Sequence, residues 1–146
     1  MPTHFPHGGD DLTDDARQLL NEIDREMPGA AAITPQCRPA IDVLETATSV
    51  EVRMDVPGVP ANSLRVAVRR NTMLIAGAKP GGALEAASRY HLAERSYGRF
   101  ARAVRLGGAF DATRARATLR AGELRIVLPL VPERRGRVLM IPVESP

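Results

Sequence analysis

The chain has 146 residues, of which 44% are hydrophobic and 25% are charged, with a formal net charge of +3 at pH 7. This length predicts one domain with appendages, and an aromatic content of only 3% requires a core built from aliphatic side chains. No stretch approaches the roughly 20 apolar residues of a membrane span, and the N-terminus lacks the pattern of a signal peptide, so a cytoplasmic location is expected.

The charges are distributed unevenly along the chain. Residues 1–40 carry seven acidic and three basic side chains, a net charge of −4, whereas residues 41–146 carry ten acidic and seventeen basic ones, a net charge of +7. An acidic arm on a basic body indicates self-association or a shielded surface. Every base except Lys79 is arginine, which pairs well with carboxylates. A biased base composition in the source genome explains this excess equally well.

Residues 1–40 are predicted to form an N-terminal arm with one amphipathic helix at about 13–27. Thr13 can cap this helix, and Pro28 and Gly29 end it. Its apolar stripe includes Leu19, Leu20, Ile23 and Met27. A helix this short is marginal alone, so the stripe needs a partner, which is either its own domain, an oligomer or another protein.

From residue 41 the apolar period changes to two, which is typical of strands with one solvated face. Strands are predicted near 50–56, 64–69, 73–76, 100–106, 114–120 and 123–128. A long loop begins at residue 79, and Tyr90 and Leu92 indicate a weak strand inside it. Seven or more short strands without helices between them predict an all-β fold, an antiparallel immunoglobulin-like β-sandwich over residues 41–130.

Residues 131–146 are predicted to be a C-terminal extension. A basic spacer separates the sandwich from an apolar patch formed by Ile141, Pro142 and Val143. Two branched side chains on a tether are suited to fill a groove on another chain, and Pro142 restricts any strand pairing to a sheet edge. The tail therefore indicates that the protein assembles rather than catalyses a reaction.

No catalytic, cofactor-binding or metal site is predicted, so the protein is not expected to be an enzyme. None of His4, His7 and His91 adjoins a nucleophile motif, and the single Cys37, which fits a reducing compartment, lies in a Pro-flanked linker. There is no phosphate-binding loop of the Walker type. Nucleic-acid binding is not expected, because the arginines alternate with apolar residues and are not interleaved with aromatic ones.

Arg102 is predicted on the same strand face as Phe100, Val104 and Leu106. A charge on an apolar face must be paired or exposed. Arg102 therefore either meets a carboxylate at an interface or lies at a sheet edge, and the interface is favoured.

Five short segments, in order and at matching spacing, resemble the small heat shock proteins and their α-crystallin domain, over residues 41–143. These segments resemble D-x-P-G-[VF] at 55–59, N-x-L-x-I-x-G at 71–77, E-R-x-x-G-x-F at 94–100, A-x-L-x-x-G-x-L at 117–124 and I-x-[IV] at 141–143. The chain departs from the family pattern at Gly107-Gly108, at Pro60-Ala61 and in an arm with Phe5 as its only aromatic residue.

The resemblance implies a chaperone of the stress response, an ATP-independent holdase without cofactors that binds partly unfolded client proteins and suppresses their aggregation. Its partners would be clients and copies of itself. The arm side chains Leu19, Leu20, Ile23 and Met27 would then bind clients. The alternative is a monomeric p23-like β-sandwich, a co-chaperone or adaptor that binds one folded partner.

The resemblance also implies how the oligomer is built. Dimers would form by exchange of a strand in the long loop, with Tyr90, Leu92 and Arg102 at the interface. Ile141, Pro142 and Val143 would anchor one dimer to the next. The receiving groove would be lined by Leu64, Val66, Val68, Ala117 and Leu119.

Overall fold

The computed structural model describes residues 14–26, 36–81, 84–132, 138 and 140–145. One α-helix lies within this part of the chain, α1 (Asp14–Glu26). The strands found there are β1 (Ile41–Glu45), β2 (Ser49–Asp55), β3 (Arg65–Arg69), β4 (Thr72–Lys79), β5 (Gly98–Arg105), β6 (Arg116–Arg120) and β7 (Glu123–Pro129). Two short 3-10 helices, Ala61–Ser63 and Ala112–Arg114, precede β3 and β6.

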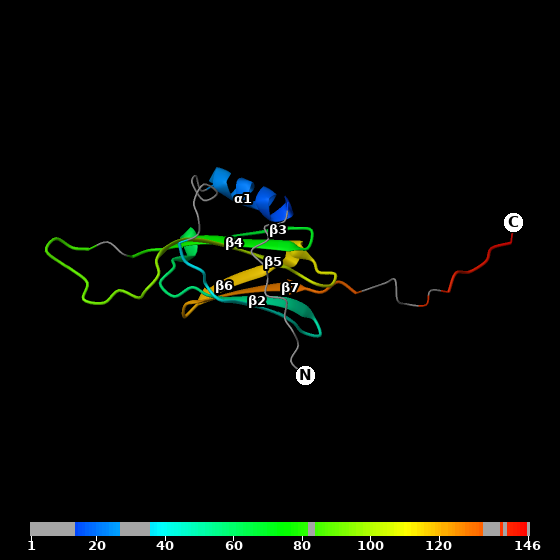
Figure 1. Ribbon diagram of the computed structural model, residues 1–146. Coiled ribbons are helices and arrows are strands. Elements are labelled where there is room, and N and C mark those ends of the chain that lie inside the picture. The colour runs from blue at the N-terminus through cyan, green and yellow to red at the C-terminus, as the bar shows by residue number, and fades with distance from the viewer. Residues whose placement is uncertain (1–13, 27–35, 82–83, 133–137, 139, 146) are drawn as a thin grey trace, which may run out of the picture.

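The strands form two stacked sheets, with the order β1-β2-β7-β6 in one and β3-β4-β5 in the other (Figure 1). Every neighbouring pair of strands is antiparallel. The predicted all-β antiparallel sandwich with an N-terminal helix is therefore confirmed.

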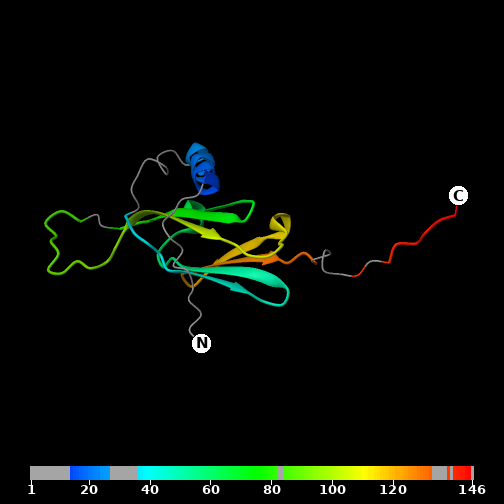
Figure 2. The same ribbon diagram turned by 45° about the vertical axis from the view of Figure 1, so that its right-hand side comes forward.

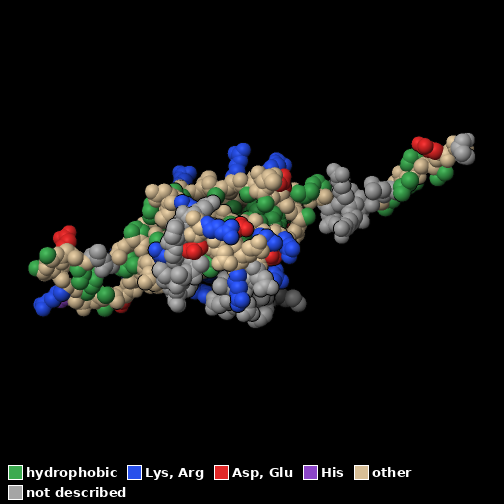
Figure 3. Space-filling model, turned by 90° about the horizontal axis from the view of Figure 1, so that it is seen from above, with side chains coloured by type: hydrophobic (Ala, Val, Ile, Leu, Met, Phe, Trp, Pro, Cys, Tyr) green, Lys and Arg blue, Asp and Glu red, His purple; other side chains and the backbone are tan. Residues whose placement is uncertain are grey.

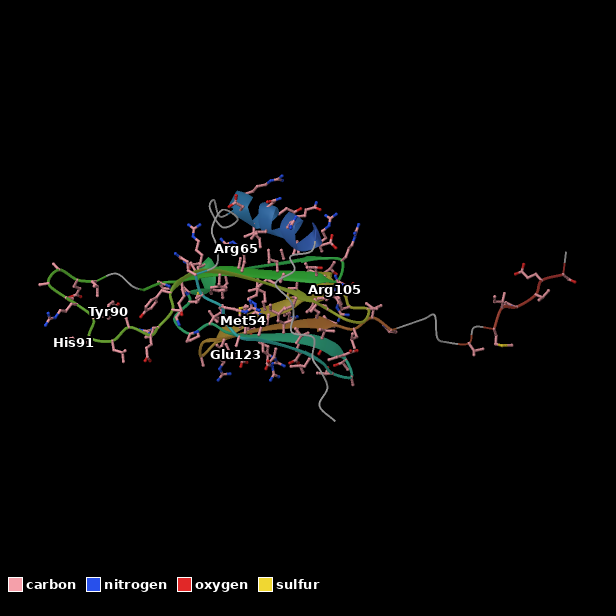
Figure 4. The ribbon with its side chains drawn as sticks, in the orientation of Figure 1. Met54, Arg65, Tyr90, His91, Arg105 and Glu123 are labelled. Atoms are coloured by element: carbon pink, nitrogen blue, oxygen red, sulfur yellow. The ribbon has the colours of Figure 1, made fainter. Side chains whose placement is uncertain are left out.

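The core lies between the two sheets. On β2, Val50, Val52 and Met54 alternate with polar residues as the sequence predicts, and all three are buried. Met54 lies between the two sheets (Figure 4). The opposite sheet supplies Met73 and Ile75, and β7 completes the cluster with Leu124, Ile126 and Leu128. Burying one such side chain contributes roughly 1.5–3 kcal/mol, so this cluster is the main source of stability.

A second apolar layer lies on the outer face of the β3-β4-β5 sheet, where α1 covers it (Figure 2). Leu19 and Ile23 pack there against Leu74 and Ala76. Because β4 is covered on both faces, its residues from Thr72 to Gly77 are all buried, without alternation. Of the three partners that the sequence left open for the helix, this structure shows its own domain.

Two features of the fold differ from the sequence prediction. The weak strand at Tyr90 and Leu92 is not formed, and residues 84–97 belong to a loop that projects from the sandwich (Figure 1). β1 was not predicted as a separate strand. It pairs only with β2, and its apolar side chains Ile41, Val43 and Leu44 follow no strict alternation.

Candidate assembly and client-binding surfaces

The predicted tail anchor projects away from the sandwich (Figure 1). Ile141 is 84% exposed and Val143 is 97% exposed, and neither belongs to a strand. Figure 3 shows hydrophobic side chains gathered along both projecting segments, the tail and the long loop. Docking of the tail on another chain stays a prediction.

The predicted groove residues lie on the two strands β3 and β6, each of which is the edge of its sheet. Their side chains face the space between the sheets, because Val66 and Val68 pair with Ile75 and Met73, and Ala117 and Leu119 pair with Ile126 and Leu124. Leu64, Val68 and Leu119 pack against the core, whereas Val66 and Ala117 are more exposed.

These two edges lie on the same side of the sandwich. The segment 36–39 leads into β1 and is bonded to β5, with the Gln36 amide donating to the Arg99 carbonyl at 2.9 Å. The β1 and β5 edges are therefore neighbours, which leaves β3 and β6 together at the opposite edge. The fold thus brings the five groove residues to one apolar, partly open edge.

The predicted dimer residues on the loop are open to solvent. Leu92 is 74% exposed, and Tyr90 is also exposed, on the part of the loop that lies far from the sandwich (Figure 4). Nearby, the Arg95 guanidinium lies 5.0 Å from the centroid of the Tyr97 ring. An isolated strand has no hydrogen-bonding partner, which explains why this segment is not a strand in a single chain. Its role in a dimer stays a prediction.

Arg102 shares its strand face with Phe100 and Val104, as alternation predicts, and is half-buried opposite Ile75. Its Nη1 donates to the carbonyl oxygen of Pro39 at 2.6 Å, which ties the segment before β1 to β5. The carboxylate partner expected at an interface stays a prediction.

The predicted client-binding side chains belong to α1. Leu19 and Ile23 are buried against the sheet, Leu20 is half-buried, and Met27 lies outside the described residues. Within this single chain the stripe therefore contacts its own domain. Client binding through it requires α1 to leave the sheet.

Ion pairs lie on the outer faces of both sheets. Asp15 on α1 accepts a hydrogen bond from Arg69 at 3.1 Å and lies 3.8 Å from Arg70. On the other sheet, Glu51 accepts from Arg125 at 2.8 Å and from Arg53 at 3.1 Å. The hydrogen bond from Arg125 is the main reason why the pKa of Glu51 lies below its usual value, although burial opposes it.

Sequence reasoning missed the pairs of Asp15 with Arg69 and of Glu51 with Arg125, because it predicted neither where α1 docks nor which strands are neighbours. Cys37 is half-buried, its Sγ lies 3.4 Å from the Gly98 carbonyl oxygen, and burial raises the pKa of the thiol.

Among the described residues no cluster of His, Cys, Asp and Glu could hold a metal ion. None of their helices is long and apolar enough to cross a membrane.

A family model described as the Hsp20/alpha crystallin family matches residues 42–144, which is most of the chain. The chain belongs to this family. The match covers both sheets, the long loop and the Ile141–Val143 patch, so it agrees with the resemblance seen in the sequence segments.

Individual relatives agree with this membership. Spore protein SP21 of Stigmatella aurantiaca is 32% identical over 99 residues, which cover 68% of this chain and 59% of that protein. The 18.9 kDa heat shock protein of Oryza sativa subsp. japonica is 34% identical over 117 residues, which cover 80% of this chain and 66% of that protein. The match thus spans about two thirds or less of both relatives.

A solved structure supports the fold independently. Heat shock protein 16.0 from Schizosaccharomyces pombe superimposes with a TM-score of 0.62 and 26% sequence identity, covering 74% of this chain and 99% of that one. These comparisons favour the small heat shock proteins over a p23-like adaptor.

Proposed function

We propose that this protein is an ATP-independent holdase, which binds partly unfolded proteins during stress and keeps them from aggregating. The observation that carries the proposal is the match of the Hsp20/alpha crystallin model to residues 42–144. Heat shock proteins among the matched relatives support a role in the stress response.

Exposed apolar side chains support an assembled form of the protein. Leu92 on the loop and Ile141 and Val143 on the tail are among the most exposed large hydrophobic residues of the described chain. Removing such side chains from water favours association. We propose that the loop segment adds a strand to the edge of a partner, with Arg102 near the contact. The tail patch docks at the β3 and β6 edges of a neighbouring dimer.

The apolar stripe of α1 is the proposed client contact. Leu19, Leu20, Ile23 and Met27 offer aliphatic rather than aromatic area, and an unfolded client offers the same kind of surface. Because a helix of 13 residues is marginal on its own, α1 depends on a packing partner, and a client can take the place of the sheet.

A light-scattering assay without nucleotide tests the proposal. A model client is heated above its melting temperature alone, with this protein, and with an equal mass of an unrelated β-sandwich protein as the control. The protein is expected to suppress the scattering in a concentration-dependent manner, and added ATP is expected to change nothing. Scattering equal to that of the control would contradict holdase activity.

A further inference from the structure

The outer face of the β3-β4-β5 sheet has a floor of small apolar side chains. The register places Ala67 beside Leu74 and Leu74 beside Ala103, and it pairs Ala76 with Ala101 in the next row. All four alanines and Leu74 pack in the cluster beneath α1. Because alanine side chains are short, this floor is nearly flat, so it can contact apolar side chains of different shapes.

Basic residues frame this floor. On the same face, Arg65 and Arg69 alternate with Ala67 on β3, and Arg99 and Arg105 alternate with the alanines on β5. Arg65 and Arg105 lie toward opposite ends of α1 (Figure 4). The sequences of β3, β4 and β5 contain no acidic residue.

One nitrogen of these guanidinium groups is buried without a partner among the described residues. The Nη1 atom of Arg99 is buried and has no hydrogen-bond partner within the described part of the chain. A buried donor without a partner is costly, and a carboxylate is the strongest acceptor that could meet it. The face therefore favours an occupant that is apolar in the middle and acidic at its borders.

α1 has this character. Its 13 residues hold five acidic and two basic side chains, and Leu19 and Ile23 reach the floor. Asp15 pairs with Arg69 and Arg70, and its side chain remains 24% exposed, so salt weakens this contact. The helix covers the face through the buried side chains Ala16, Leu19 and Ile23 and through a screened ion pair. Its apolar cluster is separate from the core between the sheets, so α1 can open locally while the sandwich stays folded.

We propose that α1 is an internal competitor, which covers a client site on the outer face of the β3-β4-β5 sheet. The site takes apolar segments of unfolded proteins that carry carboxylates at their flanks, and α1 must leave before such a segment binds. This inference rests on the proposed holdase function. It adds a second client surface, on the sandwich itself, to the stripe of α1.

Fluorescence anisotropy on the full chain tests the inference. The probe is a labelled peptide with the sequence of residues 14–26, and its control has all five acidic residues replaced by lysine. The release variant Leu19→Asp/Ile23→Asp uncovers the face, and a third protein adds Ala103→Glu to block the floor. If α1 covers the face about 90% of the time, the release variant should bind the acidic peptide about tenfold more tightly than the unchanged chain. The blocked variant and the lysine peptide should show no such binding.

The inference would be overturned if the acidic peptide bound the unchanged chain and the release variant with equal affinity. It would also be overturned if the lysine peptide bound the release variant as tightly as the acidic one, or if the acidic peptide still bound after Ala103→Glu. Circular dichroism checks that the strands persist. If the release variant does not fold, Asp15→Arg is used in its place, because it breaks the ion pair with Arg69 and keeps the apolar contacts of Leu19 and Ile23. If the chain suppresses client aggregation but the release variant does not bind the acidic peptide more tightly, this inference fails and the proposed function stands. A chain without holdase activity refutes the proposed function, whatever the peptide does.

Discussion

Gly77 and Phe100 face each other across β4 and β5, and their contact explains two positions of the segments that resemble the family. A Cβ atom on Gly77 would lie 2.8 Å from Cζ of Phe100 and 3.0 Å from Cδ2 of Leu64. No side chain fits there without moving the ring. The ring is buried in the core, so the glycine is required by close approach and not by a turn.

Gly98 is required for a different reason, and this gives the first prediction. Its φ of 101° is unfavourable for other residues, and an added Cβ would collide with the Gln36 side chain, whose Oε1 accepts from the Arg99 amide at 3.2 Å. Gly98→Ala should therefore lower the free energy of unfolding by about 1–3 kcal/mol in urea denaturation. Gly107→Ala is the control, since nothing lies within 4 Å of its Cβ position, and it should stay within about 0.5 kcal/mol of wild type. Equal effects of both changes would contradict this role of Gly98.

Glu51 gives a prediction about pH. Its side chain is largely buried between Arg53 and Arg125, and these contacts lower its pKa below the ordinary value of 4.5. A lowered folded-state pKa contributes stability that is complete above the unfolded pKa and is lost as the pH falls through the folded pKa. Glu51→Gln should therefore be less stable than wild type at pH 7, with the difference shrinking below about pH 4.5. Thermal unfolding of Glu51→Gln and of wild type, measured at pH values from 7 to below 4.5, checks this prediction.

Glu45, an exposed glutamate on β1, is the matched control for that experiment. At pH 7, Glu45→Gln should stay within about 0.5 kcal/mol of wild type. A difference between Glu51→Gln and wild type that grows on acidification would contradict the assigned ion pair.

At the scale of elements, periodicity was enough to predict α1 and most strands. The predicted helix at 13–27 agrees with Asp14–Glu26, and the alternation of Val50, Val52 and Met54 gave both the strand and its buried face. The pairing of β2 with β7 could not be predicted, because it joins residues such as Glu51 and Arg125 that are 74 positions apart. The charge asymmetry indicated self-association or a shielded surface, but only the fold shows that α1 covers the β3-β4-β5 face.

The projecting loop is the element with the clearest expected loss of function. Replacing residues 81–93 with a short turn should remove the strand offered to a partner and convert dimers into monomers. Tyr90→Ser/Leu92→Ser at unchanged loop length should weaken the dimer in the same direction. Leu84→Ser is the control, because Leu84 is exposed on the same loop outside the proposed strand. The mass measured by light scattering distinguishes monomers from dimers. Dimers that persist after the replacement would contradict the role of the loop.

At the scale of the whole molecule, the tail should connect dimers. Burying Ile141 and Val143 is worth about 3–5 kcal/mol per site before ordering costs, and several sites in one assembly multiply the effect. Ile141→Gly/Val143→Gly should therefore reduce a large oligomer to dimers with folded sandwiches.

Val138→Gly/Met140→Gly is the matched control for the tail, since both side chains are exposed on the same segment outside the anchor. This control should keep the wild-type mass. A mass that is unchanged by the loss of Ile141 and Val143 would mean that the tail is not the anchor.

The proposed holdase is distinguished from a p23-like adaptor by the state of the partner that it binds. A client protein is mixed with this chain in the absence of nucleotide and analysed by size-exclusion chromatography with light scattering, before and after heating through the client's melting temperature. The two proteins should elute separately before heating and together, in a soluble complex, after it. Binding of the native client before heating, or precipitation of the client while this chain elutes alone, would contradict the account.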